Sequence, residues 1–412
     1  MLPQTQLILA IEQLNYRLTV GDLATAQGLD LRVANRELIK LASLTAAHLQ
    51  VAETGEVAYV FASDLRQRLF RRSLQLRLLS LGEQVWKWLF WLFRISFGIL
   101  LILAIVIVIV GIVVALTAIQ SQKDQDREQP GADSSIDWEG FSPGGWIYWG
   151  NPWSVFMPNY YEQPVITAAN PAPKLGFLEA VFSVLFGDGN PNRNLEQKRF
   201  QAIANLIRQH QGAVIAEQVA PYLDEVSSTN EDYMLPVLVK FNGYPQVSET
   251  GELAYIFPDL QQVATEREAQ SGPGYLLELP WSFSRASQGQ VLQTIGLGVF
   301  YLAIALVLGG LLQEVRELDG LLAVIAGLYG WLLAYAILFV TIPGIRFLWL
   351  QGVNAQINQR NRERLTRLTV LQNPALAPKL AFANQLAIAQ QVVDPNQLAY
   401  TTEKDYLEQS DT

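Results

Sequence analysis

Three long stretches of the chain contain no charged residue: Ile95 to Ile119, Val291 to Leu312 and Leu321 to Ile345. At 1.5 Å per helical residue, each is long enough to cross the roughly 30 Å hydrocarbon core of a bilayer. The pattern therefore predicts three transmembrane helices. The second and third are separated only by the eight residues 313–320, of which four are charged, so we expect them to form an antiparallel hairpin.

Outside these stretches, one short pattern occurs twice. Residues Val51 to Phe61 read VAETGEVAYVF and residues Val247 to Phe257 read VSETGELAYIF, with eight of eleven positions identical. Each segment has β-forming residues on both sides of a Glu-Thr-Gly-Glu turn, whose glycine can adopt positive φ. The repeat therefore predicts two β-hairpins of the same kind.

Helical patterns precede both hairpins. Before the first, the sequence predicts a helix over 20–27, a turn with Asp30 as N-cap, and a second helix over 31–42. Before the second, the expected helices cover 199–208, 215–223 and 232–241. The inward positions of the first copy are Val33, Ala34, Leu38 and Leu41, and Val219, Met234 and Val237 match Leu23, Leu38 and Leu41. Each copy resembles a helix-turn-helix followed by a wing.

The predicted fold class is a mainly α membrane protein with three transmembrane helices and two winged-helix-like α+β modules. The expected domains are a first module (1–65), a basic juxtamembrane linker (66–94), transmembrane helix 1 (95–119), an aromatic-rich juxtamembrane segment with a short amphipathic helix (120–192), a second module (193–265), a linker (266–290), a transmembrane hairpin (291–345) and a basic-then-acidic helical tail (346–412).

Tryptophan and basic residues indicate where the membrane surface lies. All ten tryptophans flank or accompany the apolar stretches, as expected of side chains that favour the bilayer interface. Residues 64–94 carry seven basic residues against two acidic ones, so this segment should lie on anionic headgroups on the cytoplasmic side. The predicted membrane-surface residues are Arg66, Arg68, Arg71, Arg72, Arg77, Lys87, Trp86, Trp88 and Trp91.

The charge pattern leaves the topology open. Residues 346–380 are also basic, yet three crossings would place the two basic segments on opposite sides. Either the charge rule fails at one end, or the chain re-enters the membrane between residues 120 and 195. The twelve residues from Gly176 to Gly187 are the expected place for such a crossing, although they also suit a surface helix.

Composition narrows the function classes. Half of the residues are hydrophobic, 16% are charged and the formal net charge is −9, which fits a membrane protein and argues against a general nucleic-acid binder. The absence of cysteine excludes disulfides and thiolate-bound metals or clusters. No nucleophile–base pair, metal set or phosphate loop is visible, so the sequence predicts neither an enzyme nor a cofactor.

One basic stripe is a candidate partner or nucleic-acid surface. Arg32, Arg36 and Lys40 fall at i, i+4 and i+8 on the second predicted helix of the first module. The same helix carries Glu37, and the corresponding helix of the second module has only one lysine, Lys240. Protein binding is therefore favoured over phosphate contacts.

Several stretches resemble a family of membrane proteins shared by cyanobacteria and plant chloroplasts. They are Phe93 to Gly98, Phe186 to Asn192, Ala220 to Asp224, Leu235 to Val239 and Tyr400 to Asp405. The resemblance implies a photosynthetic membrane, either the thylakoid or the plasma membrane of a cyanobacterium. Some plant members carry a name that suggests iron–sulfur cluster biosynthesis, but a chain without cysteine has no thiolate to ligate a cluster.

The favoured function is a non-enzymatic membrane-anchored adaptor or assembly factor of a photosynthetic membrane, acting through the modules and the tail. Its expected partners are anionic headgroups of the bilayer and another protein, either membrane-bound or soluble, with self-association as a further option. The alternative is a membrane-tethered transcriptional regulator that binds DNA through the first module.

Overall fold

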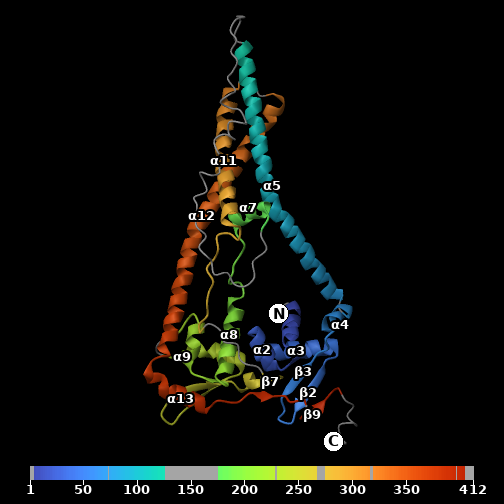
Figure 1. The fold of residues 1–412 in the computed structure, drawn as a ribbon, viewed down its shortest axis with the longest axis vertical. Coiled ribbons are helices and arrows are strands. Elements are labelled where there is room, and N and C mark those ends of the chain that lie inside the picture. Colours follow the sequence, from blue (N-terminus) through green and yellow to red (C-terminus); the bar gives the residue numbers. More distant parts are fainter. Residues whose placement is uncertain are drawn as a thin grey trace. The chain divides into compact units, whose positions relative to one another are not determined.

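The computed structural model describes residues 4–72, 74–125, 175–227, 230–266, 274–315, 319–395 and 397–403. They form a mainly helical protein with small sheets, divided into two compact units (Figure 1). Unit 1 contains residues 1–82, 191–280 and 355–412, and unit 2 contains residues 83–190 and 281–354.

The first module of unit 1 follows local sequence signals closely. Its elements are α1 (Gln4–Gln13), β1 (Arg17–Leu18), α2 (Val20–Gln27), α3 (Leu31–Thr45), β2 (His48–Ala52) and β3 (Val57–Val60). Thr19 and Asp22 form a capping box at the start of α2, and Gly28 ends the helix with φ of +61°. Asp30 caps α3 by accepting from the N–H of Arg32. The predicted 20–27 helix and the Asp30 cap are therefore confirmed.

The second module repeats the same order of elements. It comprises α8 (Leu195–Gln209), β4 (Ala213–Val214), α9 (Ala216–Val219), 3-10 turns at Ala220–Tyr222 and Asp232–Met234, α10 (Leu235–Phe241), β5 (Tyr244–Val247) and β6 (Leu253–Ile256). Val51 pairs with Val57 in the first hairpin and Val247 with Leu253 in the second, so both hairpins have the same register. Gly55 and Gly251 have φ of +91° and +87°, as the turns require. Both predicted hairpins are confirmed.

One core serves both modules. Leu38 and Leu41 of the first module and Met234 and Val237 of the second are all buried, as predicted. Val33, which we expected to face inward, is 40% exposed. Ala34, its neighbour along the helix, faces the core as predicted.

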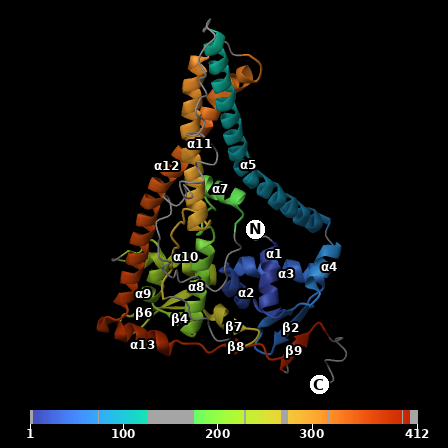
Figure 2. The same cartoon turned by 45° about the horizontal axis from the view of Figure 1, so that its top comes forward.

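The remainder of unit 1 wraps the two modules. Its elements are α4 (Leu65–Arg72), a 3-10 turn at Pro258–Gln261, β7 (Gln262–Val263), a 3-10 turn at Pro374–Leu376, α13 (Ala377–Gln385), β8 (Gln391–Val392) and β9 (Leu398–Thr401). β9 is the edge strand beside β2 in a sheet of order β1-β3-β2-β9, and β8 runs parallel to β7 (Figure 2). The segment predicted as a helical tail thus also contains strands.

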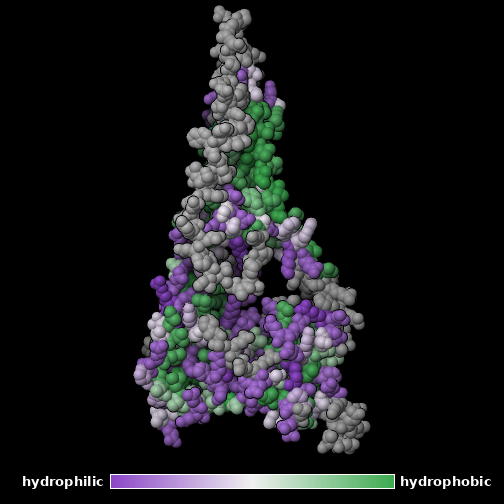
Figure 3. All heavy atoms as spheres, viewed as in Figure 1, coloured by the Kyte–Doolittle hydropathy of each residue, from purple (hydrophilic) through white to green (hydrophobic). Residues whose placement is uncertain are grey.

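Unit 2 is built from long apolar helices. The helices α5 (Leu74–Gln125), α11 (Gln288–Glu314) and α12 (Gly320–Val370) contain the three predicted apolar stretches, and each is long and apolar enough to cross a membrane. Hydrophobic side chains gather on these helices, whereas the visible surface of the modules is mainly hydrophilic (Figure 3). Both α5 and α12 continue well beyond the predicted apolar stretches.

Close helix contacts in unit 2 occur at only some of the small residues. Gly309 lies against the Tyr329 hydroxyl, so an added Cβ would collide with it. By contrast, Gly330 and Ala334 on α12 are exposed. The buried face of α12 uses Ile325, Leu332, Ala336 and Phe339 instead.

The short helix expected between Gly176 and Gly187 is present as α7 (Phe177–Phe186). The six consecutive residues 180–185 are buried, so the helix is enclosed on all sides rather than amphipathic. Phe182 of α7 packs edge-to-face on Phe90 and Phe97 of α5.

Candidate partner-binding surface

The two modules are joined through α2 and α8. An added Cβ at Gly28 would lie 2.5 Å from the carbonyl oxygen of Gln197, so only glycine allows the two backbones to approach this closely. Gln197 also donates a hydrogen bond to Gln27 at 2.9 Å, and Gln201 donates to the carbonyl of Ala26 at 2.6 Å. The close backbone approach and these hydrogen bonds therefore define how α2 and α8 pack on each other.

A buried ion pair holds this joint. Arg208 Nη2 donates to Asp22 Oδ1 at 3.1 Å, and the two side chains are 9% and 3% exposed. The other carboxylate oxygen of Asp22 accepts the N–H groups of Thr19 at 3.0 Å and Ala264 at 2.9 Å. Since a buried charge is costly without its partner, the pair fixes how the modules sit on each other.

The tail strand β9 completes the first module only. Tyr400 lies opposite Val51, and the N–H of Leu49 donates to the Thr402 hydroxyl at 2.8 Å. At the corresponding position of the second hairpin stands Pro245, which has no N–H to donate. Proline thus disfavours strand addition at the β5 edge.

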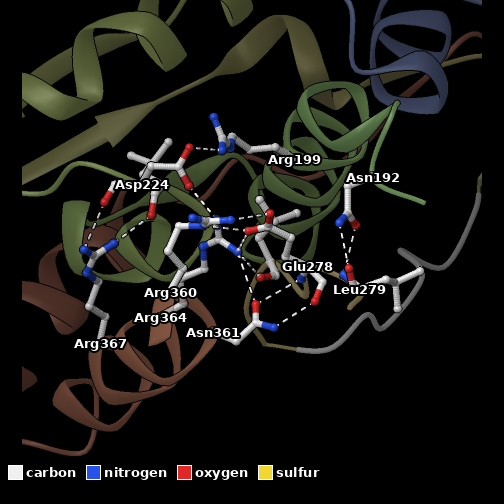
Figure 4. A network of polar contacts seen from close by, with 11 residues as sticks. Asn192, Arg199, Asp224, Glu278, Leu279, Arg360, Asn361, Arg364 and Arg367 are labelled. Carbon is white, nitrogen blue, oxygen red and sulfur yellow. Dashed lines mark hydrogen bonds and ion pairs between the residues drawn. The ribbon is translucent and has the colours of Figure 1, made fainter. Parts of the chain in front are cut away.

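Figure 4 shows the polar network that holds the end of α12 on the second module. Arg360 donates to both carboxylate oxygens of Glu278, at 2.9 and 2.7 Å, and the buried Arg364 pairs with Asp224 at 2.5 Å. Burial alone would raise the pKa of Asp224. The hydrogen bond from Arg364 and the charge of Arg199 outweigh burial and hold that pKa below its usual range.

Lys379 of α13 forms a second set of ion pairs between the tail and the second module. Its ammonium group donates to Glu217 at 2.8 Å and to Glu231 at 2.6 Å. Burial would lower the pKa of Lys379, but the two carboxylates raise it above its usual value. Three of the six basic residues between 346 and 380, Arg360, Arg364 and Lys379, are thus paired with carboxylates within the protein, which charge counting along the sequence does not reveal.

The predicted stripe Arg32, Arg36 and Lys40 lies on the exposed face of α3. Arg32 pairs with Asp30 at 3.4 Å, and the exposed apolar side chain of Ile39 lies on the same helix. The structure therefore brings the three basic residues together on a surface of mixed character. Their partner stays a prediction.

The second module exposes apolar side chains on its corresponding helix and on the strand that follows. We call these residues the α10–β5 surface; they are Leu235, Val239, Tyr244 and Val247, exposed by 56, 62, 49 and 62%. The one lysine of this helix, Lys240, places its ammonium 3.4 Å from the centroid of the Phe200 ring of its own module. The α10–β5 surface is consequently apolar where the first module is basic.

The predicted membrane-surface residues lie partly in the described structure. Trp86, Trp88 and Trp91 are exposed along α5, as is Lys87, and Arg66 donates to both oxygens of Glu12, at 2.6 and 2.7 Å. The side chains of Arg68, Arg71, Arg72 and Arg77 lie outside the described residues, as do Trp138, Trp146, Trp149 and Trp153.

Candidate metal ligands and histidines bear on the predicted lack of a catalytic site. Over that part of the chain, no group of three or more His, Asp and Glu side chains could hold a metal ion. The half-buried His210 lies beside Gln218, and burial lowers its pKa. The absence of an enzymatic site stays a prediction.

Sequence reasoning missed the residues that build the joint and the tail contacts. Asp22 carries a local signal only for its capping of α2, and its pairing with Arg208, like that of Arg364 with Asp224, joins residues far apart along the chain. Asp224 ends one of the stretches that carry the family resemblance, and its ion pair with Arg364 gives that stretch a structural role.

Comparison with known proteins relates the chain to a plant protein. The chain is 34% identical, over 423 aligned positions, to an uncharacterized chloroplastic protein of Arabidopsis thaliana. The alignment covers 97% of this chain and 79% of the plant protein. No protein-family model matches the chain, and no solved structure matches it.

Proposed function

The chain belongs to the same family as this chloroplastic plant protein, and we propose that it is a non-enzymatic membrane-anchored adaptor or assembly factor of a photosynthetic membrane. Three apolar helices and the chloroplastic relative support the thylakoid, or the plasma membrane of a cyanobacterium, as its location. In this proposal the helices anchor the protein and the paired modules bind a protein partner.

The two modules are, in this proposal, duplicated winged helices. Their shared order of helix, strand, two helices and hairpin supports this assignment, as does the shared hairpin register. The helices α3 and α10 then occupy the position that contacts partners in winged-helix proteins.

The observation that carries the proposal is the α10–β5 surface. Its four apolar side chains are between 49 and 62% exposed. An apolar patch on a protein surface is a common mark of a protein–protein contact, in which burying such side chains supplies the binding energy.

A quantitative co-purification experiment tests this function. The tagged full-length protein and its Leu235→Ser/Val239→Ser variant would be purified from solubilised native membranes, and co-eluting proteins measured by mass spectrometry. We expect the specific partner to fall by at least about tenfold in the variant, because a burial of about 1.5–3 kcal/mol per side chain is lost.

The control is Ile39→Ser, the equivalent of Leu235 in the first module, which is exposed to a similar extent at 53%. It should retain the partner. An unchanged set of co-eluting proteins in the Leu235→Ser/Val239→Ser variant, with the fold intact, contradicts the proposed role of the surface.

The exposed stripe on α3 favours a second candidate, a membrane-tethered DNA-binding regulator. For the adaptor, we expect the full chain in detergent to bind duplex DNA no better than micromolar at physiological salt, given its net charge of −9. Tight, salt-sensitive binding that is lost in the Arg32→Ala/Arg36→Ala variant would replace the adaptor by the regulator.

We further propose that all of unit 1 lies on the cytoplasmic side of the membrane. Residues 1–82, 191–280 and 355–412 form one compact unit, and buried residues of both modules share one core. The chain that leaves unit 1 through α5 then returns between residues 123 and 190. This topology places both basic segments, residues 64–94 and 346–380, at the cytoplasmic side and so satisfies the charge rule at both ends.

A further inference from the structure

Unit 2 contains a pocket of about 390 Å³ between the end of α7, the segment before α11, and α12. Its walls are mostly apolar and include Ile345 and two tryptophans. The rings of Trp281 and Trp349 meet edge to face, with 5.6 Å between their centroids. Two charged residues, Asp188 and Arg346, also line it. The volume lies within the range of small-ligand pockets.

Asp188 already has a full set of partners. Arg94 donates to one carboxylate oxygen at 2.5 Å, and the Ser183 hydroxyl and the N–H of Arg285 donate to the other at 2.5 and 2.8 Å. Burial would raise the pKa of Asp188, but these hydrogen bonds and the charge of Arg94 hold it below its usual range. The Arg94–Asp188 pair is therefore neutral overall.

Arg346 brings a net positive charge to the pocket, because Asp188, the carboxylate whose charge acts on it, is already paired with Arg94. The three hydrogen bonds of Arg346 go to the backbone carbonyls of Ser183, Val184 and Phe283, and among the described residues it makes no ion pair. The first two carbonyls belong to the last turn of α7, so the guanidinium caps that helix. Of the five N–H groups of arginine, these bonds use three, and Nε–H and one N–H on Nη2 have no hydrogen-bond partner among the described residues. Charged N–H groups of this kind suit an oxyanion.

Glycine at position 187 makes this geometry possible. Gly187 has φ of +80°, and an added Cβ there would lie 2.3 Å from Arg346 Nη2. The sequence around the pocket also indicates that the pocket lies at the level of the bilayer interface. Arg346 is the first charged residue after the uncharged stretch from Leu321 to Ile345, and tryptophan is typical of the bilayer interface.

We propose that this pocket binds the anionic headgroup of a membrane lipid, with Arg346 pairing to its phosphate or sulfonate. Trp281 and Trp349 pack on the glycerol and the first acyl carbons. The assignment rests on the membrane anchoring proposed above. It adds one specific lipid site to that anchor.

The test measures lipid binding to the purified full chain in detergent by native mass spectrometry. Phosphatidylglycerol and phosphatidylcholine of the same acyl composition are titrated separately. We expect phosphatidylglycerol to bind at least about tenfold more tightly, because the choline ammonium of phosphatidylcholine already balances its phosphate. Arg346→Gln should weaken phosphatidylglycerol more than phosphatidylcholine, so that this preference is lost. Arg362→Gln, an equal charge loss at an exposed position of α12, is the matched control and should keep the preference.

Three results would overturn the site. They are equal affinity for the two lipids, an unchanged preference in Arg346→Gln, and inorganic phosphate binding as tightly as the lipid, which would indicate a free-anion site. If Arg346→Gln fails to fold, lipid binding is measured on Trp349→Ala instead. That variant should weaken phosphatidylglycerol binding by at least about threefold. Carbonate extraction of native membranes tests the anchoring separately, so a protein that stays in the pellet without a lipid preference contradicts the site alone.

Discussion

At the residue scale, the joint between the modules depends on a carboxylate and a guanidinium placed where water is excluded. Asp22 has both oxygens occupied by donors from three parts of the chain. Such a pair adds little stability relative to apolar residues, yet its loss on one side leaves an uncompensated charge. Its main contribution is to specify one orientation of the modules.

Asp22→Ala should therefore destabilise the protein strongly, by about 3–5 kcal/mol, since it strands the Arg208 charge in the core. The measurement is the apparent unfolding temperature in detergent. Glu12→Ala, which breaks the exposed ion pair with Arg66, should change stability by less than about 1 kcal/mol. Equal shifts of the unfolding temperature in the two variants would show that the buried ion pair contributes no more to stability than the exposed one.

His210 should make stability depend on pH. Burial lowers its pKa, whereas in the unfolded chain the pKa is about 6.5. As pH falls below about 6.5, the unfolded chain takes up a proton that the folded one does not, so stability is lost until the folded pKa is passed.

We expect the difference in unfolding temperature between pH 7.5 and pH 5.5 to shrink in His210→Gln. The control His48→Gln changes the other histidine, which is exposed, and should leave the difference as in the original chain. A pH response that is the same in all three proteins would exclude His210 as its source.

At the scale of elements, the tail strand β9 pairs with the first hairpin and not with the similar second one. Leu49 offers an N–H to Thr402 at the β2 edge, and the corresponding Pro245 at the β5 edge does not. Because this N–H points away from β3, its loss leaves the hairpin ladder itself intact.

Leu49→Pro should release β9, so the amides of Tyr400 and Thr402 lose protection from hydrogen exchange by at least about tenfold. Pro245→Leu is the matched control and should leave those amides protected. Retained protection in Leu49→Pro would mean that β9 is held by other contacts.

Sequence reasoning located the elements whose ends carry local signals. The α2 helix begins at the Thr19 capping box and ends at Gly28, and α3 begins after Asp30. It failed where partners are distant. The pairing of Val51 with Tyr400 has no local signal in the sequence. Helix periodicity alone also did not predict that Val33 faces the solvent. For the candidate surface, the sequence identified the α3 stripe but not the α10–β5 surface, because exposure there depends on what the tail leaves uncovered.

At the scale of the whole molecule, the shared core of unit 1 leads to a defined topology. Reporter fusions after residues 65, 270 and 412 should all report the cytoplasmic side, and fusions after 130 and 316 the opposite side. The reason is that parts sharing one core cannot be separated by a bilayer. Opposite signals at 65 and 270 would contradict the proposed topology.

The pairing of β9 with β2 also sets an order of events during synthesis. Val51 leaves the ribosome 349 residues before Tyr400. At about 5–20 residues per second, the first sheet waits roughly 20–70 s for its fourth strand. Throughout that interval the β2 edge is open to other strands, which makes the nascent chain a substrate for chaperones and a candidate for mispairing between neighbouring polysomes. The last step of maturation therefore occurs at the module that was made first.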